Sequence, residues 1–134
     1  MASKAFLMIR SSIYIAPAEN KGRGVFTSEA IAAGTAIEIV PVIVMSRNER
    51  IFLDQTLLHD YIFEWGYEKD RCCMALGYVP LYNHSSEANC DYEMDYENEL
   101  ISIRTLRAIS AGEELLINYN GTWNDKGPVW FEKK

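Results

Sequence analysis

The sequence predicts a mainly β fold made of several small sheets, with one short helical insert. Its apolar residues occur in short runs that are separated by glycines and polar turns. The run Leu100 to Arg104 alternates apolar and polar residues, as a strand with one buried face does. Only one strong helix-start signal stands out along the chain. Many short strands with a single modest helix indicate a β-rich domain.

The first strands are expected on either side of a glycine turn. Ile13 and Ile15 flank Tyr14, and the preceding Ala5 to Ile9 is apolar, which favours a short strand. Gly22-Arg23-Gly24 predicts a turn, and Val25-Phe26 begins the next strand. The chain should therefore reverse direction near Gly22.

The next stretch combines strand and helix signals. Thr35 to Met45 is rich in Ile and Val but contains Pro41, which predicts two short strands that meet at a bend. Ser46 and Glu49 have the spacing of a capping box, which predicts the start of the helical insert. The apolar residues expected to hold this insert against the core are Ile51, Leu53, Leu57, Leu58 and Tyr61.

Further short strands are expected in the second half of the chain. Tyr61 to Trp65 and Arg71 to Leu76 are predicted to pair around a turn at Gly66. Leu100 to Arg104 and Leu115 to Tyr119 complete the set. This order of elements contains no repeat and no linker, so one domain is expected.

Composition and charge restrict the classes of function. The chain has 134 residues, of which 49% are hydrophobic and 24% charged, a globular composition for a single core. No apolar run approaches the roughly 18 residues that cross a bilayer, so no membrane partner and a cytoplasmic location are expected. The net charge of −6 disfavours a nucleic-acid partner and favours a basic one.

The three cysteines predict neither a disulfide framework nor a metal site. Cys72 and Cys73 are adjacent, Cys90 is isolated, and no Cys/His cluster has zinc spacing. We expect all three to be small buried residues. The acidic residues between Glu87 and Glu99 allow two interpretations: they attract a lysine-rich segment, or they form a solvated face.

Three segments carry most of the functional information. The first is Lys21-Gly22-Arg23-Gly24-Val25-Phe26, where glycines allow close backbone approach to a ligand. The second contains Asn83-His84 and, further on, Asn89 and Tyr92. The third is Gly112 to Tyr119, which reads Gly-Glu-Glu-Leu-Leu-Ile-Asn-Tyr. Each segment by itself is weak evidence for a functional site. The three together, in this order along the chain, are stronger evidence.

Together these segments resemble the signature of the SET domain, a family that transfers methyl groups from S-adenosylmethionine to lysine. The resemblance spans about residues 12 to 131. It implies a single SET domain over 1–134, with a core at about 12–121 and an aromatic closing segment at 122–134. It also implies small sheets tied by a pseudoknot between the Asn-His segment and the strand before Tyr119. The absence of zinc-binding cysteines after the domain is similar to minimal bacterial and viral members.

The resemblance also implies roles for individual residues. Tyr119 matches the family's tyrosine beside the transferred methyl and is the candidate catalytic residue. Tyr92 and Ile117 match positions along the channel for the substrate lysine. The candidate cofactor contacts are Lys21, Gly22, Arg23, Gly24, Asn83, His84 and Trp130, the last as an indole face for the adenine.

This chemistry explains why such residues are needed. In-line transfer to an amine requires nitrogen, methyl carbon and sulfur to be aligned in a dry channel. The lysine must be neutral, and burial beside a cationic sulfonium lowers its pKa. Tyrosine hydroxyls and backbone carbonyls are sufficient to orient the amine, so no metal is expected.

Departures from the family pattern leave alternatives open. Ser86, Ala88 and Gly121 replace a cysteine, a proline and a second channel tyrosine that many members have. The main expectation is methylation of a basic protein or peptide. One alternative is a peptide-binding module that has lost turnover, and another is methylation of a small amine. The target, the number of methyl groups added and a homodimer are left open by the sequence.

Overall fold

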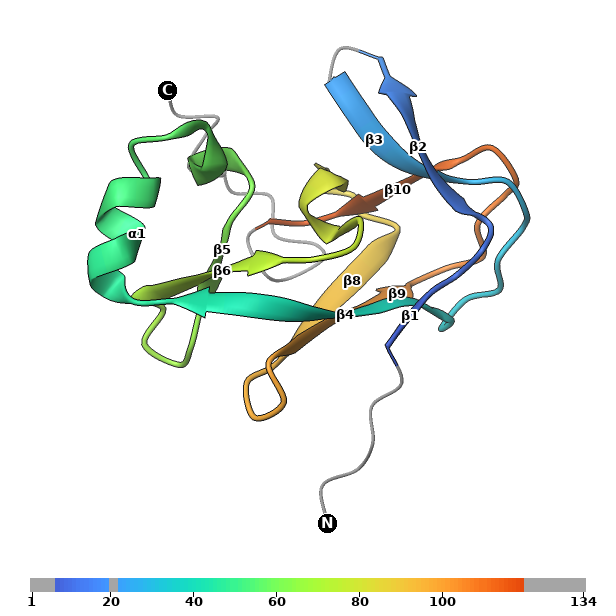
Figure 1. Cartoon of the computed structure of the whole chain (residues 1–134). Coiled ribbons are helices and arrows are strands. Elements are labelled where there is room, and N and C mark those ends of the chain that lie inside the picture. Colours follow the sequence, from blue (N-terminus) through green and yellow to red (C-terminus); the bar gives the residue numbers. More distant parts are fainter. Residues whose placement is uncertain (1–6, 20–21, 120–134) are drawn as a thin grey trace.

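Two β-sheets form the body of the protein in the computed structural model, which describes residues 7–19 and 22–119 (Figure 1). The strands are β1 (Met8–Ile9), β2 (Ile13–Ala18), β3 (Gly22–Thr27), β4 (Ala36–Met45), β5 (Phe63–Trp65), β6 (Arg71–Ala75), β7 (Asn83–His84), β8 (Cys90–Asp95), β9 (Leu100–Thr105) and β10 (Glu114–Ile117). The helical segments are α1 (Arg47–Leu53) and the 3-10 turns η1 (Leu57–Asp60) and η2 (Val79–Leu81). The predicted mainly β fold with a short helical insert is confirmed.

The larger sheet has the order β5-β6-β4-β9-β8, and β1 also pairs with β4. The smaller sheet has the order β2-β3-β10-β7. Most neighbours are antiparallel, whereas β7 and β10 are parallel. No helix in residues 7–19 or 22–119 is long and apolar enough to span a membrane.

The prediction of two strands around Pro41 was wrong, because β4 continues through this proline. Residues on the N-terminal side pair with β9, and those from Val42 onward pair with β6. The amide of Val42 donates to the carbonyl of Glu99 at 3.0 Å on the β9 side. Successive backbone N–H groups of a strand point to opposite edges, so the nitrogen of Pro41 faces the edge of β4 away from β9. On that edge it lies between the residues that pair with β1 and those that pair with β6. A proline is tolerated there because no hydrogen-bond donor is needed in the gap between β1 and β6.

The capping box is confirmed, but the predicted burial of the helical insert was wrong. The amide of Glu49 donates to the Ser46 hydroxyl, and Ser46 returns a bond to the Glu49 carboxylate, both at 3.1 Å. Neither α1 nor η1 contains a buried residue, and Ile51, Leu57 and Leu58 are exposed. Two turns of helix are too short to bury a continuous face, so capping rather than core packing defines the start of this insert.

The core lies between the sheets and is filled by aliphatic residues. Val25, Ile37, Ile101, Ile103 and Leu115 are fully buried. The alternation predicted around Leu100 to Arg104 is confirmed in β9. The three free cysteines are buried as expected.

One carboxylate lies inside this core. Glu38 of β4 is fully buried, and its Oε2 accepts from the Tyr78 amide at 2.6 Å while Oε1 accepts from the Tyr82 hydroxyl at 2.9 Å. Burial raises the pKa of Glu38, and these hydrogen bonds oppose that rise. Glu38 thereby ties the central strand to residues 77–82.

Gly77 is the position at which this arrangement leaves no room for a side chain. Its φ is +65°, and a Cβ there would lie 2.2 Å from Glu38 Oε2 and 2.7 Å from Val40 Cγ1. Gly34 has a similar φ of +74°, but a Cβ there meets nothing within 4 Å.

We therefore expect Gly77→Ala to destabilise the fold more than Gly34→Ala. Both substitutions place alanine in the left-handed region at a cost of about 1–2 kcal/mol. Only Gly77→Ala also displaces the buried carboxylate, so its loss in free energy of unfolding should exceed that of the control by about 2 kcal/mol. Denaturant unfolding measures both values, and equal losses would contradict the proposed importance of Glu38.

Candidate active site

The smaller sheet is closed by two segments that are distant in sequence. β7 lies parallel to β10, with Asn83 opposite Leu116 and His84 opposite Ile117. Asn89 continues this contact from a buried position: its side chain accepts from the Leu116 amide and donates to the Glu114 carbonyl, both at 2.8 Å. The arrangement agrees with the expected pseudoknot between the Asn-His segment and the strand before Tyr119.

The two glutamates of the Gly-Glu-Glu motif hold opposite ends of this crossing. Glu113 is paired with Arg107, and the hydrogen bond from that guanidinium is the main reason why the pKa of Glu113 is lowered. Glu114 accepts a hydrogen bond from the Asn83 side chain at 2.8 Å. The sequence analysis assigned neither residue a role, although the motif itself contained them.

Gly24 allows the Asn83 amide to reach the backbone of β3. The Asn83 side chain donates to the Arg23 carbonyl at 3.1 Å. A Cβ on Gly24 would lie 2.4 Å from Glu114 Oε2 and 2.9 Å from Asn83 Nδ2. The expected close approach is therefore present, although residues 22–24 lie within β3 and do not form the predicted turn.

A cavity of about 560 Å³ lies beside these residues and is lined in part by Gly22, Arg23, Asn83, Asp60 and Tyr119. Its size is within the usual range for small-molecule sites. It offers a guanidinium for a carboxylate and a carboxylate for cationic groups, which suits a ligand that carries both. S-adenosylmethionine has this combination, so the residues present fit the cofactor implied by the motifs.

Tyr119 lines this cavity, and hydrogen bonds hold both its backbone and its hydroxyl. Its amide donates to His84 Nδ1 at 3.1 Å, and its hydroxyl donates to the Tyr82 carbonyl. Burial is the main cause that raises the pKa of Tyr119, so the phenol stays protonated near neutral pH. The bond to the Tyr82 carbonyl uses the hydroxyl hydrogen and so orients the phenol.

Two further aromatic rings surround Tyr119. The Phe63 ring lies edge-on to Tyr119 at 6.2 Å and to Tyr92 at 5.4 Å between centroids. The Tyr92 hydroxyl also donates to the Tyr119 carbonyl at 3.5 Å, and burial raises the pKa of Tyr92. The three rings form an apolar wall with two protonated hydroxyls, each of which donates to a backbone carbonyl.

A smaller depression, too narrow to hold a water molecule, shares part of its lining with the first cavity. Asp60, Tyr61, Pro80 and Tyr119 line both, and Ile62 and Phe63 line only the smaller one. Tyr119 therefore lies where the larger cavity meets this narrow, largely apolar depression. This is the arrangement that transfer between a bound ligand and a buried amine requires.

Not every predicted site residue lines these cavities. Ile117 is fully buried in the core, and the His84 ring holds the Tyr119 backbone. Lys21 and Trp130 lie outside the described residues. Sequence analysis missed Asp60 and Phe63 because they belong to no motif. A channel role for Phe63 follows only from its ring contacts.

The acidic residues of β8 lie on the other side of that strand from the channel. Tyr92, Met94 and Tyr96 pack against the core. Alternation along β8 turns Asp91, Glu93 and Asp95 toward the opposite face. Within the described residues, no group of three or more His, Cys, Asp or Glu side chains could hold a metal ion.

Comparisons with known proteins agree with this geometry. A family model described as the SET domain matches residues 22–120. A Schizosaccharomyces pombe histone-lysine N-methyltransferase specific for histone H3 lysine 37 is 40% identical over 126 residues, which is 93% of this chain and 80% of that protein.

Solved structures give the same result for the fold. A candidate histone methyltransferase of Plasmodium falciparum has 31% identity and a TM-score of 0.67, over 87% of this chain and 100% of that one. Polycomb repressive complex 2 of Chaetomium thermophilum bound to S-adenosylmethionine has 20% identity and a TM-score of 0.69. That match covers 87% of this chain but 16% of the other, and it shows the fold alone.

The family match covers most of the chain, including the crossing of β7 with β10 and the tyrosine beside the larger cavity. The fungal relative is also matched over most of its length. The chain therefore belongs to the SET-domain family of S-adenosylmethionine-dependent protein-lysine methyltransferases.

Proposed function

We propose that this SET domain methylates a lysine of a histone or of a similarly basic protein segment, with Tyr119 as the catalytic residue. The observation that carries the proposal is the position of Tyr119, whose side chain lines both the large cavity and the smaller one. The specificity of the fungal relative for histone H3 supports the substrate class. The net charge of −6 is also suited to a basic partner.

The chain's own residues would bind the cofactor and orient it. When bound, S-adenosylmethionine supplies the methyl group on a sulfonium. Arg23 can pair with its carboxylate, and Asp60 can pair with a cationic group. Gly22 and Gly24 keep the β3 backbone accessible, and Asn83 fixes the opposite wall through its bond to Arg23.

The aromatic wall would prepare the lysine for transfer. A free lysine side chain has a pKa of about 10.4, and enclosure by apolar rings favours its neutral form. Phe63, Tyr92 and Tyr119 would exclude water and restrict the amine to one approach. Because the Tyr119 hydroxyl donates to the Tyr82 carbonyl, its oxygen would accept a hydrogen bond from the amine.

Several parts of the sequence-based interpretation stay predictions. These are the contribution of Lys21 and Trp130 to the cofactor site, a channel role for Ile117, a homodimer and a cytoplasmic location. No observation favours a peptide-binding module without turnover. We therefore treat the domain as an active enzyme.

The proposed substrate class can be tested with purified histones. Incubation of the protein with core histones and labelled S-adenosylmethionine should place label on a lysine of histone H3, which mass spectrometry of the digested protein can locate. A basic protein unrelated to histones and a mixture of free amines serve as comparisons. Label on the free amines alone, with none on any protein, would reject a protein substrate.

The role of Tyr119 predicts a strong effect on turnover. Tyr119→Phe removes the hydroxyl but keeps the ring that packs on Phe63. We expect kcat to fall by about 100-fold or more, the usual scale for a lost catalytic polar group. Cofactor affinity and thermal unfolding should change little. Tyr67→Phe is the matched control, since Tyr67 is 90% exposed and its substitution should leave turnover as it was. Nearly normal methylation by Tyr119→Phe would exclude it from catalysis.

The role proposed for Trp130 predicts a change in cofactor binding. Trp130→Ala should weaken S-adenosylmethionine binding by about 1–3 kcal/mol, as expected for the loss of an aromatic face under a base. Trp123→Ala, a second tryptophan of the same segment, is the comparison. Isothermal calorimetry measures both affinities. Equal affinity in the parent and in Trp130→Ala would show that the indole makes no stacking contact with the cofactor.

A further inference from the structure

A second depression lies on the opposite face of the strand that borders the lysine channel. Within the described residues β5 pairs only with β6 and forms the edge of the larger sheet, the kind of edge to which an extended peptide can add. Side chains alternate along β5: Phe63 faces Tyr119, and Glu64 faces Arg50 of α1. The edge of β5 therefore separates the channel from the α1 side of the sheet.

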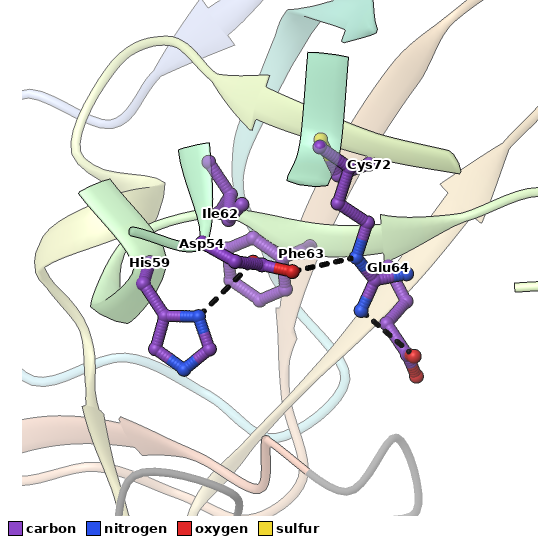
Figure 2. Close-up of a pocket in the computed structure, with 7 residues that line it drawn as sticks. Asp54, His59, Ile62, Phe63, Glu64 and Cys72 are labelled. Carbon is purple, nitrogen blue, oxygen red and sulfur yellow. Dashed lines mark hydrogen bonds and ion pairs between the residues drawn. The ribbon is translucent and has the colours of Figure 1, made fainter. Parts of the chain in front are cut away.

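The depression on the α1 side is a cavity of about 230 Å³ between α1, η1 and the β5–β6 pair (Figure 2). Ile62, Phe63 and Cys72 provide its apolar lining. Asp54, His59 and Glu64 surround this lining with polar groups, as Figure 2 shows. At about 30 Å³ for each water in the liquid, the cavity has room for one long side chain.

Ile62 and Phe63 also line the smaller cavity next to Tyr119. The two spaces are therefore neighbours, separated by the chain at the start of β5. A substrate strand paired with this edge of β5 would send alternate side chains to opposite faces. If its target lysine enters past Phe63 toward Tyr119, the residues immediately before and after that lysine turn toward the α1-side cavity.

The charges of this cavity favour a cation. The Arg50 guanidinium is held in the wall, because it donates to the Lys69 carbonyl at 2.9 Å, to the Arg71 carbonyl at 3.3 Å and to Glu64 at 3.1 Å. Asp54 interacts with His59 at 3.0 Å and with Arg50 at 3.7 Å.

Asp54 and Glu64 carry two negative charges against the one positive charge of Arg50, a net charge of −1 for these three side chains. Each carboxylate has acceptor capacity beyond these contacts. The apolar lining suits the aliphatic stem of lysine or arginine, and the carboxylates suit its charged end.

We propose that the α1-side cavity binds a lysine or arginine side chain that immediately flanks the target lysine, and so selects the methylation site. The proposal rests on the proposed function, since it concerns the substrate of the same site. Asp54 and Glu64 recognise the cation, and Tyr119 takes no part in that recognition. Selection and catalysis are thus assigned to opposite faces of β5.

The experiment uses a histone H3 peptide that contains the lysine methylated by the fungal relative. Each of the two neighbours of that lysine is set in turn to arginine, citrulline or glutamate. Citrulline has almost the shape of arginine without its charge. Peptide affinity is measured by fluorescence anisotropy with S-adenosylhomocysteine present, and KM is measured in the methyl-transfer reaction. The affinity series does not depend on turnover, so it tests the cavity even if the peptide is not methylated.

At one of the two positions, citrulline should bind about fivefold more weakly than arginine, the scale of a partly exposed ion pair, and glutamate more weakly still. In Glu64→Gln and Asp54→Asn the ratio between the citrulline and arginine peptides should fall toward one. Glu29→Gln removes the same charge at an exposed position in the turn after β3 and should keep the ratio of the parent.

Equal affinities for arginine and citrulline at both positions in the parent would overturn the proposal. A ratio that persists unchanged in both Glu64→Gln and Asp54→Asn would also overturn it. These results differ from a failure of the proposed function, which would be the absence of methyl transfer to lysine in histones. A charge preference in binding together with transfer to the central lysine would support both.

Discussion

The hydrogen bonds accepted by the buried Glu38 carboxylate are the interaction on which the rest of the site depends. Glu38 holds Tyr82 through its hydroxyl and Tyr78 through its amide. The Tyr82 carbonyl then receives the hydroxyl of Tyr119. A carboxylate in the centre of the larger sheet therefore fixes the orientation of a phenol that lines the larger cavity. Such a buried group is stabilising only while every one of its acceptors is used.

The crossing of β7 and β10 likewise positions residues beside the larger cavity. Asn89 bonds to the backbone of β10 as a neighbouring strand would, and Asn83 joins Glu114 to the carbonyl of Arg23. Two polar side chains thus connect three segments that are far apart in sequence. The cavity beside Gly22 and Tyr119 exists because these segments meet, and none of them could form it alone.

The structure separates the aromatic residues around Tyr119 from the acidic residues Asp54 and Glu64. Phe63, Tyr92 and Tyr119 are packed together and held by backbone and ring contacts. Asp54 and Glu64 lie on the exposed insert and on the outer face of β5. A rigid, apolar channel favours alignment of the reacting atoms. Partly hydrated carboxylates favour graded recognition of charge, so changes in the insert can alter specificity without disturbing the channel.

The sequence by itself determined the local features and the family. The capping box at Ser46, the strand alternation around Ile101 and the burial of the cysteines follow from short-range pattern and are present in the structure. The three motifs identified the SET domain and selected Tyr119, because their residue types and order are specific in combination.

Only the tertiary structure decided how distant residues combine. Pro41 stays inside β4 because its nitrogen faces the gap between β1 and β6, where no hydrogen-bond donor is needed. Most apolar residues of the insert, among them Ile51, Leu57 and Leu58, are exposed, because its short helices cannot bury a continuous face. Glu38 and Phe63 acquire their roles from partners 44 and 56 positions away in sequence, Tyr82 and Tyr119. A sequence pattern records spacing along the chain, whereas a buried hydrogen bond or a ring contact depends on which segments the fold brings together.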